Sequence, residues 1–134
     1  MSSDRPRPDA EGPPLDVKRI VVALDRHGVA YLLIGGLGAT LYGAERVTQD
    51  IDLLPRTDVD NLARLATALR DLGAFLRVGG LSDDEARALP VVIDGRSLAA
   101  TEVSTWRTDA GDVDVLSTIR GEHGERRRFS DLID

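Results

Sequence analysis

The sequence contains no cysteine, and among its 134 residues it has only two histidines and a single lysine, Lys18. The absence of cysteine excludes disulfide bonds, thiolate zinc sites and cysteine nucleophiles. His27 and His123 lie far apart along the chain, so a histidine-based metal site is not expected. Any bound metal should therefore be a hard cation held by carboxylate oxygens.

The chain also lacks a net positive charge and a long hydrophobic run. The net charge is −6 and the isoelectric point is about 4.9, which argues against a broad non-specific grip on nucleic acid phosphates. No apolar run approaches the roughly 20 residues needed to cross a bilayer, so no membrane partner is expected. The polar, proline-rich start is not typical of a signal peptide, which favours a cytoplasmic protein.

The length leaves room for one domain with one hydrophobic core. Residues 1–13 are polar and are predicted to form a disordered arm, and residues 14–134 a single domain. Hydrophobic spacing and capping residues predict helices over 15–27, 37–42, 58–73, 82–89 and 130–133. Short apolar or alternating runs predict strands over 30–34, 50–54, 74–78, 101–108 and 112–117, the last two as a hairpin. This order predicts an α/β or α+β fold with a small mixed β-sheet flanked by helices.

Asp50 and Asp52 flank Ile51 in the strand that Pro55 is expected to stop. Successive side chains of a strand point to opposite faces, so both aspartates should share one face while Ile51 and Leu53 point to the core. Two carboxylates about 6.6 Å apart along a strand repel each other unless a cation or a proton lies between them. Magnesium suits such a pair, and a solvated strand edge is the alternative explanation.

The strand over 30–34 ends in Gly35-Gly36 and is followed at once by the short helix predicted over 37–42. Glycine lets a backbone approach a ligand closely, and the N–H groups at a helix start can bind an anion. This suits a triphosphate placed beside metal ions. A tight strand-to-helix turn is the structural alternative.

A third acidic motif contains Asp112 and Asp114, separated by Val113. Val113 and Val115 should face the core, which leaves both aspartates on the opposite face. A strand beside residues 50–54 would bring one of them to the same cations. Alternation does not choose between the two, but Asp112 directly follows Gly111 and is expected in the turn, so Asp114 is the preferred third carboxylate.

These three motifs, in this order, resemble those of the DNA polymerase β-type nucleotidyltransferase superfamily over roughly residues 15–120. The sequences of residues 34–36, 46–54 and 107–116 are most similar to those of the minimal bacterial branch. In particular they are similar to those of the AbiEii-like toxins of toxin–antitoxin systems, which include mycobacterial nucleotidyltransferase toxins that modify transfer RNA acceptor ends.

The resemblance implies a nucleotidyltransferase fold and a two-metal transfer of a nucleoside monophosphate from a nucleoside triphosphate to a hydroxyl. Asp50 and Asp52 would hold two magnesium ions, with manganese as a substitute, and Asp114 would bind the ion that activates the attacking hydroxyl. The triphosphate would be contacted by Gly35, Gly36, Arg46 and Thr48.

The same resemblance predicts RNA, most of all a transfer RNA 3′ end, as the acceptor, and a cognate antitoxin protein as a partner. Two alternatives stand beside it: an antibiotic nucleotidyltransferase of the aminoglycoside or lincosamide type, and a degenerate binding module without catalysis. Relatives carry a nucleotide-binding lysine or arginine beyond the third carboxylate. Here Arg96, Arg107 or a second chain would supply that cation, and without it transferase activity would be weak or absent.

Overall fold

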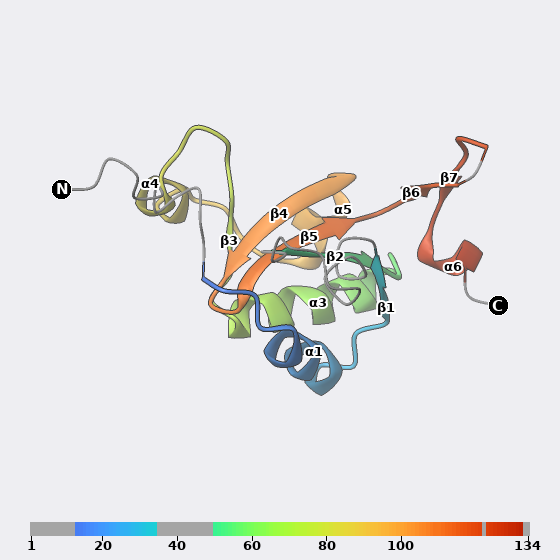
Figure 1. The fold of residues 1–134 in the computed structure, drawn as a ribbon, viewed down its shortest axis with the longest axis horizontal. Helices are drawn as coiled ribbons and strands as arrows, with labels where there is room; N and C mark the ends of the chain where they lie inside the picture. Colours follow the sequence, from blue (N-terminus) through green and yellow to red (C-terminus); the bar gives the residue numbers. More distant parts are fainter. Residues whose placement is uncertain (1–12, 35–49, 122, 133–134) are drawn as a thin grey trace, which may run out of the picture.

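A computed structural model describes residues 13–34, 50–121 and 123–132. Its main feature is a five-stranded sheet with the order β1-β2-β5-β4-β3 (Figure 1). The β2–β5 pair is parallel and the other three pairs are antiparallel, which confirms the mixed sheet. The strands are β1 (Tyr31–Ile34), β2 (Asp50–Pro55), β3 (Phe75–Leu76), β4 (Val103–Thr108) and β5 (Gly111–Leu116).

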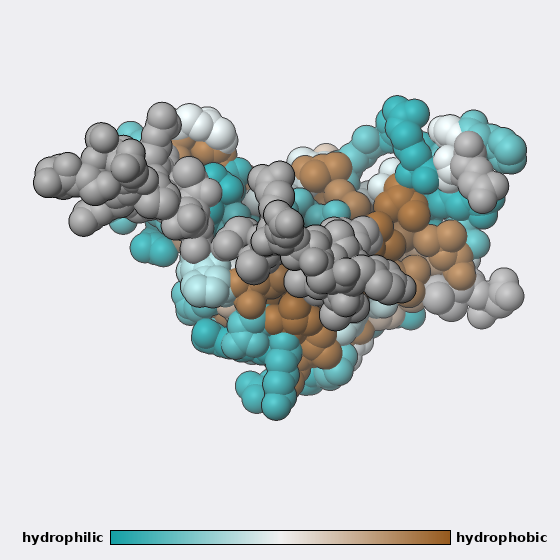
Figure 2. Space-filling model, viewed as in Figure 1, coloured by the Kyte–Doolittle hydropathy of each residue, from teal (hydrophilic) through white to brown (hydrophobic). Residues whose placement is uncertain are grey.

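Helices α1 (Val17–Arg26) and α3 (Val59–Asp71) lie on one face of this sheet (Figure 1). Asp58 caps α3 by accepting a hydrogen bond from the Asn61 backbone N–H, as its sequence position predicts. The core between these helices and the sheet is apolar, and hydrophobic residues also show on the face seen in Figure 2, below its centre and to the right. Its fully buried members include Ile20, Leu24, Leu53, Leu65 and Val113.

Two short helices follow α3. Helix α4 (Asp83–Arg87) begins with the capping box of Ser82 and Glu85 that the sequence predicts. Helix α5 (Gly95–Ala99) was not predicted, and it packs on α3 so closely that a Cβ atom on Gly95 would lie 3.1 Å from the Ala63 backbone nitrogen. The aspartate N-cap of α5, Asp94, is a signal that the sequence does contain.

The segment after β5 leaves the main sheet. A two-stranded sheet of β6 (Ile119–Arg120) and β7 (Arg126–Arg127) precedes α6 (Phe129–Leu132), and all three lie at one end of the molecule (Figure 1). Only the final helix was predicted, close to its observed bounds. The helix predicted over 37–42 lies outside the described residues. No helix in the described part of the chain combines the length and apolar character that crossing a membrane requires.

Candidate metal centre

Four aspartates from two adjacent strands share one face of the sheet. In the parallel β2–β5 pair, Asp50 lies beside Asp112 and Asp52 beside Asp114. Between them Ile51 lies beside Val113, and both are buried in the core on the opposite face. The alternation predicted for both motifs is therefore confirmed, and the parallel pairing brings the two motifs together.

Three of these aspartates, Asp50, Asp52 and Asp114, form a compact cluster. One carboxylate oxygen from each lies within 4.8 Å of the other two, and all three side chains are half-buried. Two ligands on opposite sides of one magnesium ion are about 4.2 Å apart, twice the usual Mg–O distance. The cluster is thus close to the spacing that a hard cation needs, and its all-oxygen donor set fits magnesium or manganese.

The electrostatics of the cluster favour a cation. Burial, a hydrogen bond to Asp114 and the negative charges of Asp114 and Asp50 raise the pKa of Asp52 to about 6. Burial and the charges of Asp114 and Asp112 also raise the pKa of Asp50. Burial and acidic neighbours together make Asp50 and Asp52 hold their protons more tightly, and a divalent ion would relieve the repulsion between the charges.

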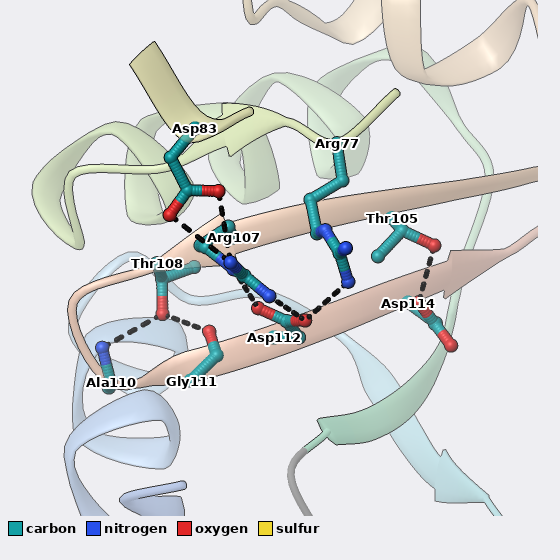
Figure 3. A network of polar contacts seen from close by, with 9 residues as sticks. All are labelled: Arg77, Asp83, Thr105, Arg107, Thr108, Ala110, Gly111, Asp112 and Asp114. Carbon is teal, nitrogen blue, oxygen red and sulfur yellow. Dashed lines mark hydrogen bonds and ion pairs between the residues drawn. The ribbon is translucent and has the colours of Figure 1, made fainter. Parts of the chain in front are cut away.

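The fourth aspartate, Asp112, is engaged by two arginines (Figure 3). Its Oδ1 accepts from Arg107 Nε at 3.0 Å, and its Oδ2 accepts from Arg107 Nη2 at 3.2 Å and from Arg77 Nη1 at 3.3 Å. Arg107 also binds Asp83 through Nη1 at 2.9 Å, which ties α4 to the sheet. Both oxygens of Asp112 therefore have charged partners, whereas Asp114 lies in the cluster.

Asp114 was preferred from the sequence because Asp112 was expected in the turn, and that expectation was wrong. Asp112 is not in the turn: it pairs with Arg107 inside the β4–β5 ladder and is 7% exposed. The turn is made by residues 109 and 110, and β5 begins at Gly111, whose φ of 108° favours glycine. The two aspartates differ in their partners: Asp112 is bound by arginines, and Asp114 belongs to the acidic cluster.

Arg107, one of the options for the nucleotide-binding cation, is buried and ion-paired in this structure. Its side chain is 2% exposed, and it forms ion pairs with the carboxylates of Asp83 and Asp112. Arg77 contacts Asp112, Asp83 contacts Arg107, and Thr105 contacts Asp114. None of the three was singled out from the sequence, because these contacts depend on how distant segments pack. The predicted nucleotide contacts Gly35, Gly36, Arg46 and Thr48 lie outside the described residues.

The comparisons with known proteins give one distant likeness. No family model matches the sequence, and no curated protein matches it. The structure is similar to the crystal structure of a putative nucleotidyltransferase from Thermotoga maritima, with a TM-score of 0.44 and 17% sequence identity. The match covers 84% of this chain and 61% of that one, so this chain spans about three fifths of that protein's length. A likeness of this degree establishes no family.

Proposed function

We propose that this chain is a metal-dependent nucleotidyltransferase of the DNA polymerase β type. The observation that supports this is the convergence of Asp50 and Asp52 on β2 with Asp114 on β5, within 4.8 Å on the face away from the core. If these aspartates were only solvated strand residues, their meeting would be unexplained, because the three half-buried carboxylates come from segments more than 60 residues apart. A site that binds divalent ions explains why they meet.

In the proposed reaction a hydroxyl of the acceptor attacks the α-phosphorus of a nucleoside triphosphate. A new oxygen–phosphorus bond forms, the bond to the β-phosphate breaks, pyrophosphate leaves, and the hydroxyl proton is released. Asp50 and Asp52 would hold two magnesium ions, and Asp114 would hold the ion next to the attacking hydroxyl. When bound, such ions stabilise the entering and leaving oxygens.

The triphosphate would lie beside Asp52. Ile34, the last residue of β1, pairs with Asp52 in the sheet, so β1 ends beside Asp52, and Gly35-Gly36 come next in the sequence. We assign the triphosphate to Gly35 and Gly36, with Arg46 and Thr48 as further contacts. This assignment rests on the sequence motif and on the position of Ile34.

For the acceptor, we propose RNA, and specifically a transfer RNA 3′ end modified by a toxin that a cognate antitoxin restrains. This proposal is supported by the sequence of residues 46–54, which is most similar to that of AbiEii-like toxins. The antibiotic and degenerate-module alternatives are outcomes of the experiments below.

The first experiment measures binding by calorimetry, with magnesium and each nucleoside triphosphate in turn. The native protein should bind at least one triphosphate only when magnesium is present. Asp52→Asn should lose most of that binding, because one carboxylate shared by both ions is removed. Asp60→Asn, on the exposed first turn of α3, is the matched control and should bind normally. Equal binding, or none, by native protein and Asp52→Asn would contradict a catalytic cluster, and absence of binding would favour the degenerate module.

The second experiment identifies the acceptor. The protein is incubated with magnesium, labelled triphosphates and total RNA, and in parallel with aminoglycosides and lincosamides. Label on transfer RNA would support the RNA acceptor. Label on a drug alone would replace that acceptor while leaving the proposed chemistry intact.

A further inference from the structure

Thr105 lies directly beside the third carboxylate of the cluster. It occupies the β4 position opposite Asp114, and its Oγ1 donates a hydrogen bond to Asp114 Oδ1 at 2.7 Å (Figure 3). Neither the motif nor the resemblance assigns Thr105 any role. The contact is short, partly buried and made to a side chain in the middle of the sheet.

The backbone of Thr105 is held from both sides. It is paired with β5 on one side, and on the other its carbonyl oxygen accepts from the Arg77 N–H at 2.9 Å. The hydroxyl is therefore presented from a fixed backbone position. An ionised carboxylate can only accept hydrogen bonds, so a donor fixed at Oδ1 orients the group and leaves Oδ2 to face an ion. Figure 3 shows the second oxygen of Asp114 turned away from Thr105.

We propose that Thr105 is a positioning residue, whose hydroxyl orients Asp114 for binding a divalent ion. This inference rests on the proposed function, because it requires the cluster to be a metal site. Hydrogen bonds from such neighbours to metal-binding carboxylates are worth about 10–100-fold in metal affinity. A threonine that served only the strand would need its β-branched shape and not its hydroxyl.

The test compares two substitutions at this position in the full chain. Thr105→Val keeps the shape and strand preference but removes the hydroxyl, and Thr105→Ser keeps the hydroxyl. Affinity for Mg²⁺ alone is measured by calorimetry, and the number of bound Mn²⁺ ions by electron paramagnetic resonance. Thr67→Val is the matched control, because it removes a threonine hydroxyl bond to the Ala63 carbonyl on α3, which packs on the other face of the sheet.

We expect Thr105→Val to weaken Mg²⁺ binding by about 10-fold or more, and Thr105→Ser and Thr67→Val to stay near the native affinity. In a transfer assay, the Mg²⁺ concentration for half-maximal rate should rise in Thr105→Val, and kcat should recover at saturating Mg²⁺. Native affinity in Thr105→Val, or equal losses in Thr105→Val and Thr105→Ser, would overturn the inference. In both cases Asp52→Asn still tests the metal site itself. If the native protein binds no Mg²⁺, the proposed function and this inference fail together.

Discussion

Replacing Asp52 by asparagine should make the metal-free protein more stable. Asparagine keeps the shape and the capacity to hydrogen-bond, but it removes one negative charge from a cluster whose members repel one another. The raised pKa of Asp52, about 6 against an ordinary value of 3.8, measures that repulsion together with burial. A carboxyl whose pKa is higher in the folded state destabilises the fold when it is ionised.

The magnitude follows from this difference. The difference between a pKa of about 6 and the ordinary 3.8 is equivalent to about 3 kcal/mol, and solvent screening of a half-buried group reduces this energy to about 1 kcal/mol. The cost is fully present above the folded-state pKa of about 6, shrinks as the pH falls, and is absent below the unfolded value of 3.8. Asp52→Asn should therefore raise Tm by about 3 °C near pH 7.5 and should leave it unchanged near pH 3.5.

The assay is thermal unfolding in EDTA and in magnesium at both pH values. Magnesium at about 100 times its Kd should stabilise the native protein by about 2.7 kcal/mol at neutral pH, and this gain should be lost in Asp52→Asn. Asp60→Asn provides the contrast, because an acidic residue in the first turn of a helix stabilises it, so its removal should lower Tm slightly. A lower Tm for Asp52→Asn in EDTA at neutral pH would refute the argument, as would an undiminished response to magnesium.

Two further predictions separate structural residues from the cluster. Asp112→Asn should destabilise the protein by about 3 kcal/mol, because the buried Arg107 loses one of its anionic partners. Urea unfolding should show this loss of stability. The stabilisation by magnesium should be retained. Asp58→Ala should cost about 1 kcal/mol through the lost N-cap of α3 without changing magnesium affinity, and an altered affinity would indicate that α3 is coupled to the cluster.

Much of the fold follows from local patterns. The spacing of leucines and the Asp58 cap predicted α3, and the alternation of Asp50, Ile51 and Asp52 predicted which face of β2 is acidic. These features depend on residues that are close in sequence, where the geometry of a helix or a strand fixes the direction of each side chain. The hairpin of β4 and β5 was predictable for the same reason, since Gly111 directly follows its turn.

The parts that could not be predicted depend on strand register. Nothing in the local sequence pairs Arg107 with Asp112, or Thr105 with Asp114; both pairs follow from how β4 lies against β5. The β4–β5 register places Arg107 beside Asp112, and the parallel β2–β5 register brings Asp114 to Asp52 in the cluster. The hairpin of β6 and β7 was missed because two-residue strands are too short to show a hydrophobic period.

The position of β5 also decides when the acidic cluster can form during synthesis of the chain. This strand is made after the other four strands of the main sheet, yet it lies between β2 and β4. While a ribosome is still translating the first hundred or so residues, β2 has no parallel neighbour, and Asp50 and Asp52 have no third carboxylate. Nascent chains therefore lack the complete set of carboxylates until Asp114 has emerged and β5 has inserted between β2 and β4.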